Sequence, residues 1–459
     1  MKAPIWPGGI RQWLSTVVLT AVALVLTLVV ISLSMGSSLP GTSVHVNLGL
    51  FQGDQEPLAD QNSQSGTTNS SEASLDTREV NRKMPEPVAT GDSHTTAKVD
   101  EEPSDSQRDA QDNCDLYRGE WFFDSSGPLY TYNSCPVITV SQNCQANGRP
   151  DSGYENWRWK PEQCILPRFD ARKFLEMMRG KTIAFVGDSV ARNQMESLLC
   201  ILWQADTPLN NTTPHMQKWI FRSTSTTIIR IWSSWLVHTS TQALEFAPEG
   251  LDKVFLDIPN ETFMQFLPSF DVLVLSSGHW YTRPSAYILK GNIVGGQRWW
   301  PHQAGKIQMK NVDVFGISTE TCLTAVATNP DFKGIAVLRT YSPDHYENGA
   351  WNTNGSCTGK FKPLDEAVRN GFIDTMYGKQ IAGFRKAVQN SGEHGSKLKL
   401  MDITETFYLR VDGHPGPYRS VDPKKKTQRG PDGKPPPQDC LHWCMPGPVI
   451  HGTRCCLRP

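Results

Sequence analysis

The chain has 459 residues and a formal net charge of −1 at neutral pH, and 38% of its residues are apolar. This composition excludes a collagen-like chain, a fully disordered chain and a membrane protein with many spans. The near-neutral charge also gives no indication of a nucleic-acid partner. The charge is unevenly distributed, because residues 34–113 have 14 acidic side chains and only 5 basic ones.

One long apolar run, residues 13–33, contains 21 residues and no charged side chain. At about 1.5 Å per residue, a helix of this length crosses a hydrocarbon core of roughly 30 Å. Lys2 and Arg11 precede the run without any acidic residue, so the positive-inside rule places residues 1–12 in the cytosol. We expect a single transmembrane signal anchor with type II topology. A cleaved signal peptide is the alternative, and both place the rest of the chain in the secretory lumen.

Residues 34–113 are rich in Ser, Thr, Gln, Asp and Glu and contain one aromatic residue and no cysteine. Such a segment buries too little apolar surface to offset its chain entropy, so we expect a disordered luminal stem. All 11 cysteines follow this stem, and in the lumen they predict disulfides with at least one cysteine left over. Zinc at Cys440 and Cys444 around His442 is an alternative, but a second finger-type pair is missing, so we expect no metal.

The luminal part has two regions. Residues 114–168 combine four cysteines with many aromatic residues and turn formers, and neither a helical nor a strand pattern dominates. We interpret this Cys-rich aromatic subdomain as a disulfide-stapled cap on the main domain, with an aromatic and basic wall of a substrate groove as the alternative. Five sequons indicate a glycoprotein, at Asn69, Asn210, Asn211, Asn260 and Asn354.

Residues 169–459 alternate helical signals with short apolar or β-branched runs. Asp170 is a candidate cap for a helix that ends near residues 179–180. Strands are predicted at residues 182–186, 271–275, 334–338 and 398–401. Because tens of residues separate these strands, the pattern favours crossover connections and a parallel sheet of the α/β class.

Gly187, Asp188 and Ser189 directly follow the predicted strand at 182–186 and precede a stretch compatible with a helix. A serine at such a turn is exposed above a helix N-terminus, where backbone N–H groups can stabilise an oxyanion. The glycine leaves room for a substrate carbonyl. The same three residues can also form a simple turn with a helix cap, so this motif is not specific by itself.

Near the C-terminus, Asp439 and His442 are three residues apart. At this spacing the carboxylate can hold one imidazole nitrogen while the other nitrogen faces a serine. Cys440 and Cys444 flank the histidine, and cross-links there would fix its position without a long helix.

Together the two motifs resemble the SGNH or GDSL-like hydrolase superfamily, in which an Asp-x-x-His motif supplies both partners of a serine. The chain is more closely similar to the plant trichome-birefringence-like family of polysaccharide O-acetyltransferases. The resemblance runs from Cys114 to about Pro448 and is carried by residues 149–152, 156–161, 179–181, 185–194, 277–280 and 439–444. It implies a three-layer fold with a central, mostly parallel sheet behind the membrane anchor.

By position, the resemblance implies Ser189 as nucleophile, His442 as its general base and acid, and Asp439 as the residue that orients His442. The Ser189 N–H and the region of Gly278 would supply oxyanion donors. The family also implies disulfides, and order and spacing suggest Cys114 with Cys164, Cys135 with Cys200, Cys144 with Cys444, and Cys357 with Cys440.

Further residues are candidates for the oxyanion or substrate site. Gly187 and Asp188 flank the nucleophile. His279 follows a strand and is expected in a groove wall rather than as the base. Arg192 and Asn193 lie one turn after the nucleophile, where they can bind donor or glycan, or serve only solvation and packing.

One segment departs from the family pattern. After Gly447 the family commonly continues with Asp-Trp-Asn and an apolar tail, whereas residues 448–456 read Pro-Val-Ile-His-Gly-Thr-Arg-Cys-Cys. A frameshift or alternative splicing would explain this difference. We therefore expect an atypical C-terminal end on the catalytic domain, and its effect on activity is left open.

The expected activity is acetyl transfer to hydroxyls of a cell-wall polysaccharide, a hemicellulose such as xyloglucan or xylan, through an acetyl-serine. No bound cofactor is expected, but an acetyl donor is required, and acetyl-CoA is one candidate. The resemblance implies a single-pass type II protein of the Golgi membrane. The alternatives are a polysaccharide acetylesterase with the same three residues and a non-catalytic glycan-binding or wall-assembly protein. The oligomeric state does not follow from the sequence.

Overall fold

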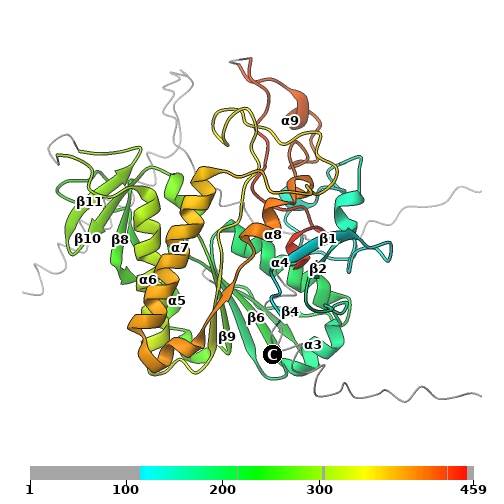
Figure 1. The fold of residues 1–459 in the computed structure, drawn as a ribbon, viewed down its shortest axis with the longest axis horizontal. Coiled ribbons are helices and arrows are strands. Elements are labelled where there is room, and N and C mark those ends of the chain that lie inside the picture. The colour runs from blue at the N-terminus through cyan, green and yellow to red at the C-terminus, as the bar shows by residue number, and fades with distance from the viewer. Residues whose placement is uncertain (1–113, 214–215, 302–304, 432, 452–459) are drawn as a thin grey trace, which may run out of the picture. The chain divides into compact units, whose positions relative to one another are not determined.

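The computed structural model describes residues 114–213, 216–301, 305–431 and 433–451 (Figure 1). The expected cytosolic segment, anchor and stem, residues 1–113, lie outside these ranges. Within the ranges, no helix combines the length and the apolar character that a membrane span requires.

A seven-stranded sheet contains all four predicted strands, in the order β13, β12, β9, β3, β6, β5, β4. Its strands from β13 to β6 are parallel, and β5 and β4 pair antiparallel. The sheet is therefore mostly parallel, as predicted. Its members are β3 (Thr182–Gly187), β4 (Leu209–Asn210), β5 (Met216–Phe221), β6 (Thr226–Trp232), β9 (Val272–Ser276), β12 (Ile335–Arg339) and β13 (Leu398–Met401).

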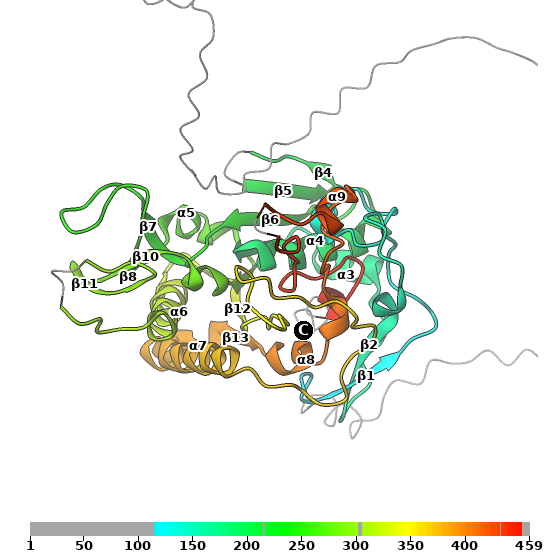
Figure 2. The same ribbon diagram turned by 90° about the horizontal axis from the view of Figure 1, so that it is seen from above.

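Helices cover both faces of this sheet (Figure 2). On one face, α3 (Ala171–Met177) and α4 (Ser189–Trp203) pack in one apolar cluster with Phe185 of β3. On the other face, α6 (Asn311–Thr328) and α7 (Gly371–Asn390) share a cluster with Ala184 and Val186. Neighbouring residues of a strand point to opposite faces, so β3 contributes to both clusters. The result is the three-layer arrangement that the resemblance implies.

Local sequence explains the two helices beside β3. The Asp170 carboxylate accepts hydrogen bonds from the backbone N–H groups of Arg172 and Lys173 at 2.9 and 3.1 Å, which confirms it as the cap of α3. Helix α4 is buried on nearly all sides, since every residue from 193 to 202 is buried. Its apolar residues in the cluster beside β3 are Met195, Leu198, Leu199, Cys200, Ile201 and Leu202.

A second sheet of four strands has no counterpart among the predicted elements. It has the order β11, β10, β8, β7, with parallel pairing between β8 and β10. Its apolar side chains meet partners from distant segments, as Val254 does with Val237 and Tyr287. Such contacts leave no local pattern. The strands are β7 (Val237–Ser240), β8 (Asp252–Pro259), β10 (Ser285–Leu289) and β11 (Asn292–Gln297).

Short helices complete the described chain. The α-helical ones are α5 (Glu261–Met264), α8 (Thr404–Tyr408) and α9 (Lys424–Thr427). The 3-10 helices are η1 (Val140–Gln142), η2 (Gly153–Asn156), η3 (Leu267–Ser269), η4 (His279–Thr282), η6 (Gly392–Lys397) and η7 (Val411–Gly413).

Residues 114–168 form the cap, with a hairpin of β1 (Gly119–Phe123) and β2 (Trp157–Pro161). Arg149 of this cap is buried and pairs with both carboxylate oxygens of Asp151 at 2.9 Å. Its guanidinium also donates to the backbone carbonyls of Asp412 and His414 at 2.7 and 2.9 Å. These contacts favour the interpretation of the segment as a cap on the main domain.

Four disulfides join the pairs that the resemblance implies, Cys114–Cys164, Cys135–Cys200, Cys144–Cys444 and Cys357–Cys440. Cys440 and Cys444 are therefore oxidised and cannot act as thiolate ligands of zinc. Cys322 is buried and free, and Cys455 and Cys456 lie outside the described residues.

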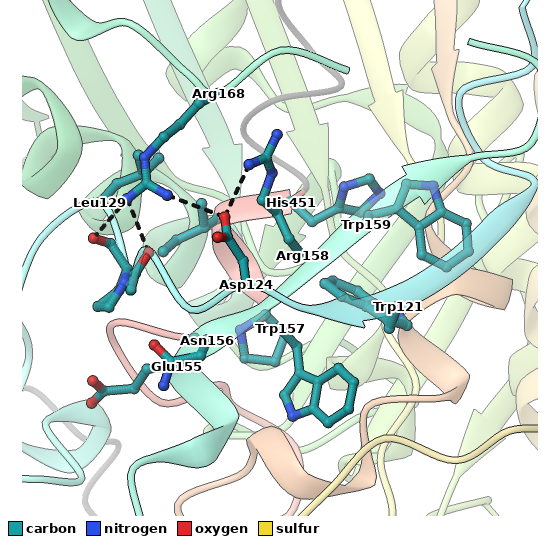
Figure 3. A pocket seen from close by; sticks show the side chains of 15 residues that line it. Trp121, Asp124, Leu129, Glu155, Asn156, Trp157, Arg158, Trp159, Arg168 and His451 are labelled. Atoms are coloured by element: carbon teal, nitrogen blue, oxygen red, sulfur yellow. Dashed lines mark hydrogen bonds and ion pairs between the residues drawn. The ribbon is translucent and has the colours of Figure 1, made fainter. Parts of the chain in front are cut away.

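The last described residues pack against the cap. Val449 is fully buried, and the His451 ring lies 5.4 Å from the rings of both Trp121 and Trp159. A pocket beside the hairpin is lined in part by Gly447, Pro448, Ile450 and His451 (Figure 3). Part of the expected atypical end is thus packed, while residues 452–459 lie outside the described residues.

Glu155, which lines this pocket, is an unusually weak acid. Burial raises the pKa of Glu155 to about 7, although the Tyr154 hydroxyl and the charge of Arg149 act in the opposite direction. An unfolded chain loses this proton near pH 4.5, whereas the folded chain keeps it up to about pH 7. Glu155 therefore destabilises the fold increasingly as the pH rises between these two values.

We predict that Glu155→Gln raises the thermal unfolding temperature at about pH 8 and leaves it nearly unchanged at about pH 4.5, because the amide is neutral at both. Differential scanning fluorimetry at the two pH values measures this. Glu120→Gln, on the exposed face of the same hairpin, is the matched control. An equal shift at both pH values would contradict the prediction.

Candidate active site

The turn from β3 to α4 places Ser189 at the first position of α4, where β3 ends. Gly187 has a φ of 154°, and a Cβ there would lie 1.7 Å from the carbonyl oxygen of Ser276. Only glycine fits this close approach of two strands. Asp188 caps α4 by accepting the backbone N–H of Val190 at 2.9 Å. The sharp turn brings the serine to the carboxyl edge of the sheet.

Ser189, His442 and Asp439 form one hydrogen-bonded chain. His442 Nε2 lies 2.7 Å from Ser189 Oγ, and His442 Nδ1 lies 2.9 Å from Asp439 Oδ2. With its Nδ1–H donated to the carboxylate, the imidazole has its Nε2 lone pair directed at the serine hydroxyl. The structure thus brings together the three residues that the two sequence motifs single out.

Asp439 is a buried carboxylate with three donors. Its Oδ1 accepts the backbone N–H groups of Leu441 and His442 at 3.2 and 3.0 Å. Although burial favours the neutral acid, the charge and hydrogen bonds of His442 hold the pKa of Asp439 well below its ordinary value. The group is therefore ionised at neutral pH. An ionised carboxylate here fixes the tautomer of His442 and favours an imidazolium if one forms.

The loop that carries His442 is held by neighbours rather than by a helix. The Cys357–Cys440 and Cys144–Cys444 disulfides lie on either side of the histidine. His414 Nδ1 lies 2.8 Å from the carbonyl oxygen of His442, and its ring stacks on Trp443 at 4.1 Å. The loop geometry therefore depends on contacts with distant segments.

Asn193 makes a further contact with this loop. Its Oδ1 accepts the Trp443 backbone N–H at 2.8 Å, and its Nδ2 donates to the Trp443 carbonyl at 3.2 Å. The side chain is fully buried. The expectation that Asn193 binds donor or glycan is wrong, because both ends of its amide are used within the protein. It is a positioning residue for the His442 loop.

The substrate-binding assignment of Asp188 needs the same correction. The carboxylate is 1% exposed, caps α4 and lies 3.5 Å from His279 Nδ1. Burial raises the pKa of Asp188, but the hydrogen bond and charge of His279 outweigh it and lower the pKa below its ordinary value. This buried carboxylate orients protein groups and is not accessible to a substrate.

Gly278 and His279 form the wall beside this turn. Gly278 has a φ of 144°, and a Cβ there would lie 2.8 Å from the Tyr341 ring. His279 stacks on that ring at 4.5 Å, and its Nε2 lies 2.9 Å from the carbonyl oxygen of Ser342. His442, and not His279, contacts the serine, in agreement with the prediction that His279 belongs to a wall.

Sequence reasoning missed two groups near the site. His414 lies in a loop whose role the sequence leaves open, and only its contact with His442 identifies it. Arg230 and Trp232 belong to β6, which has no predicted counterpart. The described residues contain no group of three His, Cys, Asp or Glu side chains that could hold a metal ion.

The chain matches two family models. Residues 166–449 match the model described as the GDSL/SGNH-like acyl-esterase family found in Pmr5 and Cas1p, and residues 112–165 match the PMR5 N-terminal domain. The boundary between the models falls within a few residues of the division at 168 and 169 drawn from the sequence.

Curated relatives from plants cover most of the chain. Trichome birefringence-like 18 of Arabidopsis thaliana is 59% identical over 374 residues, which span 79% of this chain and 70% of that protein. The protein YLS7 of Arabidopsis thaliana is 60% identical over 359 residues, 77% of this chain and 71% of that protein. Xyloglucan O-acetyltransferase 1 of Arabidopsis thaliana is 36% identical over 376 residues, 78% of this chain and 83% of that protein.

The longer family model covers more than half of the chain and includes every residue of the Ser189, His442 and Asp439 chain of hydrogen bonds. The fold, the sequence motifs and the curated relatives agree. The chain belongs to the GDSL/SGNH-like acyl-esterase family, among its trichome birefringence-like proteins.

Proposed function

We propose that the protein is a polysaccharide O-acetyltransferase that acts through an acetyl-serine on Ser189. The observation that carries the proposal is the hydrogen-bonded chain from Ser189 through His442 to Asp439, at 2.7 and 2.9 Å. Relatives named xyloglucan O-acetyltransferases support a hemicellulose acceptor, xyloglucan or xylan. The acetyl donor is an activated ester or thioester, and acetyl-CoA is our candidate.

In the first half-reaction, Ser189 Oγ attacks the carbonyl carbon of the donor while His442 Nε2 takes the hydroxyl proton. The carbonyl electron pair moves to oxygen, where the backbone N–H groups of Ser189 and Gly278 are the proposed oxyanion donors. Collapse of this intermediate breaks the bond to the leaving group, and His442 returns the proton to it. Ser189 is left as its acetyl ester.

In the second half-reaction, a sugar hydroxyl takes the place of the leaving group. His442 removes its proton as the oxygen attacks the acetyl carbonyl, and collapse restores the Ser189 hydroxyl with that proton. Asp439 stays ionised throughout and stabilises the imidazolium that each half-reaction forms. Transfer instead of hydrolysis requires that the acceptor hydroxyl, and not water, occupies this position.

A polysaccharide acetylesterase is the second candidate, because the matching family model is described as an acyl-esterase family. It would use the same residues with water as the acceptor. A non-catalytic glycan-binding or wall-assembly role does not account for the hydrogen-bonded chain of Ser189, His442 and Asp439, so we place it last.

We also propose a location for this activity, in the Golgi lumen on a single-pass type II anchor at residues 13–33. The four disulfides support an oxidising compartment, since such bonds are rare in the cytosol. The acceptor polysaccharide and the membrane are the proposed partners.

We predict that the full-length protein, quenched in acid after mixing with labelled acetyl donor, has one labelled acetyl group on Ser189. Peptide mass spectrometry measures this adduct. Ser189→Ala removes the adduct and the activity, because no other nucleophile replaces the hydroxyl. Ser223→Ala, in the turn between β5 and β6, is the matched control and retains both.

Addition of deacetylated xyloglucan or xylan oligosaccharide to the labelled protein then separates the two enzyme candidates. A transferase moves the label to the sugar. Release of labelled acetate without sugar acetylation identifies the esterase. Activity without any label on Ser189 would contradict the acetyl-serine for both candidates.

We predict that Asp439→Asn lowers kcat by roughly 10³- to 10⁴-fold with little change in the KM for the acceptor, because a neutral amide no longer fixes the tautomer of His442. Steady-state kinetics with the full-length protein measure both constants. Asp422→Asn, in the surface loop before α9, is the control and keeps wild-type kcat. A loss of less than tenfold for Asp439→Asn would show that the carboxylate does not orient the base.

A further inference from the structure

Two arginines lie on the elements that adjoin the nucleophile, one on α4 and one on the neighbouring strand β6. Arg192 is one turn after Ser189 in α4, about 4.5 Å further along the helix axis. Arg230 lies in β6, two residues before Trp232, which is paired in register with Gly187 at the end of β3. Both arginine side chains are half-buried. Burial, with the neighbouring charge of Arg192, lowers the pKa of Arg230 to about 10, so Arg230 remains cationic at neutral pH.

Among the described residues, Glu196 is the carboxylate near both arginines. Its Oε1 lies 3.9 Å from Arg192 Nε, and its charge also acts on Arg230. The oxygens of Glu196 are already used, because they accept the Thr139 hydroxyl at 2.8 and 2.9 Å and the Thr139 backbone N–H at 3.2 Å. Two guanidinium groups against one carboxylate leave an excess positive charge beside the site.

Three hydrogen-bond donors of these arginines are also unsatisfied. Arg192 Nε and the Nε and Nη1 of Arg230 are buried and have no acceptor in the part of the chain that the structure describes. Buried donors of this kind are rare in folded proteins. Arg149 and Arg410 differ in their carboxylate partners, because each of them binds both oxygens of an aspartate, although Arg410 Nη1 also has no acceptor among the described residues. Arg192 and Arg230 share the single carboxylate of Glu196 instead.

Aromatic side chains connect the arginine pair to the wall of the active site. The Arg230 guanidinium lies 5.5 Å from the ring of Trp232, which is 38% exposed. That ring meets Trp280 edge to face at 5.8 Å, and Trp280 directly follows His279. These contacts connect Arg230 to the segment that carries His279.

We propose that Arg192 and Arg230 form an anion subsite beside Ser189 that binds a carboxylate or phosphate group of a substrate. The planar guanidinium suits both groups, because its N–H donors match the spacing of their oxygens. The anion would come from a phosphate of the acetyl donor or from the carboxylate of an acidic sugar in the acceptor. This inference rests on the proposed function, since it assigns part of the substrate to the same site.

The test uses the full-length protein and Arg230→Gln, which removes one cation and keeps a side chain of similar length. Arg222→Gln, on an exposed position before the same strand, is the matched control. The binding arm titrates inorganic phosphate and glucuronate separately and follows the thermal unfolding temperature. We expect at least one anion to raise the unfolding temperature of the wild type and of Arg222→Gln. The same anion should not raise the unfolding temperature of Arg230→Gln.

The kinetic arm compares acetyl-CoA with p-nitrophenyl acetate as donor, and acceptor oligosaccharides with and without a glucuronic acid branch. We expect Arg230→Gln to raise the KM for one anionic substrate by about tenfold, as for the loss of one charge-assisted hydrogen bond. The neutral substrate of the same pair keeps its KM. The substrate that is affected identifies the source of the anion.

Two results would overturn the subsite, namely equal anion binding by wild type and Arg230→Gln, or an equal rise of KM for charged and neutral substrates. The second result would show a structural role for Arg230. Failure of the proposed function is a separate outcome. If the wild-type protein transfers no acetyl group, but binds an anion that Arg230→Gln no longer binds, the subsite stands and the transferase is rejected.

Discussion

The hydrogen bond between His442 and Ser189 joins side chains that are 253 residues apart in sequence. A bond of 2.7 Å tolerates little movement of either partner, and the histidine lies in a loop without helical support. The disulfides of Cys440 and Cys444 and the buried amide of Asn193 hold that loop. Contacts of the cap and of α4 with the C-terminal segment therefore help to keep this distance short.

The sheet fixes the other partner of that bond. Gly187 allows β3 and β9 to approach closely, and the chain then turns into α4 and presents Ser189 at the helix N-terminus. Asp188 then serves two neighbours at once, as the cap of α4 and as the partner of His279. Three consecutive residues thus have separate roles. Gly187 allows the close approach of the strands, Asp188 caps α4, and Ser189 is the proposed nucleophile. Each role depends on the position of its residue in the turn, so a shift of the sequence by one residue would disrupt all three.

Buried charged side chains have different partners in the structural part of the molecule and in the proposed anion subsite. Arg149 and Arg410 bind aspartate carboxylates in full, and Asp439 is matched by His442 and two backbone N–H groups. Pairing of this kind keeps the desolvation cost of each charge low. Arg192 and Arg230 instead share the carboxylate of Glu196, and the position of Arg192 one helical turn from the nucleophile supports an interpretation of the pair as a place for substrate charge.

The sequence by itself determined the features that local chemistry controls, namely the strand before Ser189, the Asp170 cap, the four parallel strands and the Asp-x-x-His motif. Resemblance to a family added the disulfide pairs, which spacing alone does not establish. Only the tertiary structure decided that Asn193 holds Trp443 instead of a substrate, that a second sheet packs beside α6, and that Arg230 lies next to Arg192. Periodicity and caps are properties of neighbouring residues, whereas the partner of a buried side chain depends on which distant segment the fold brings to it.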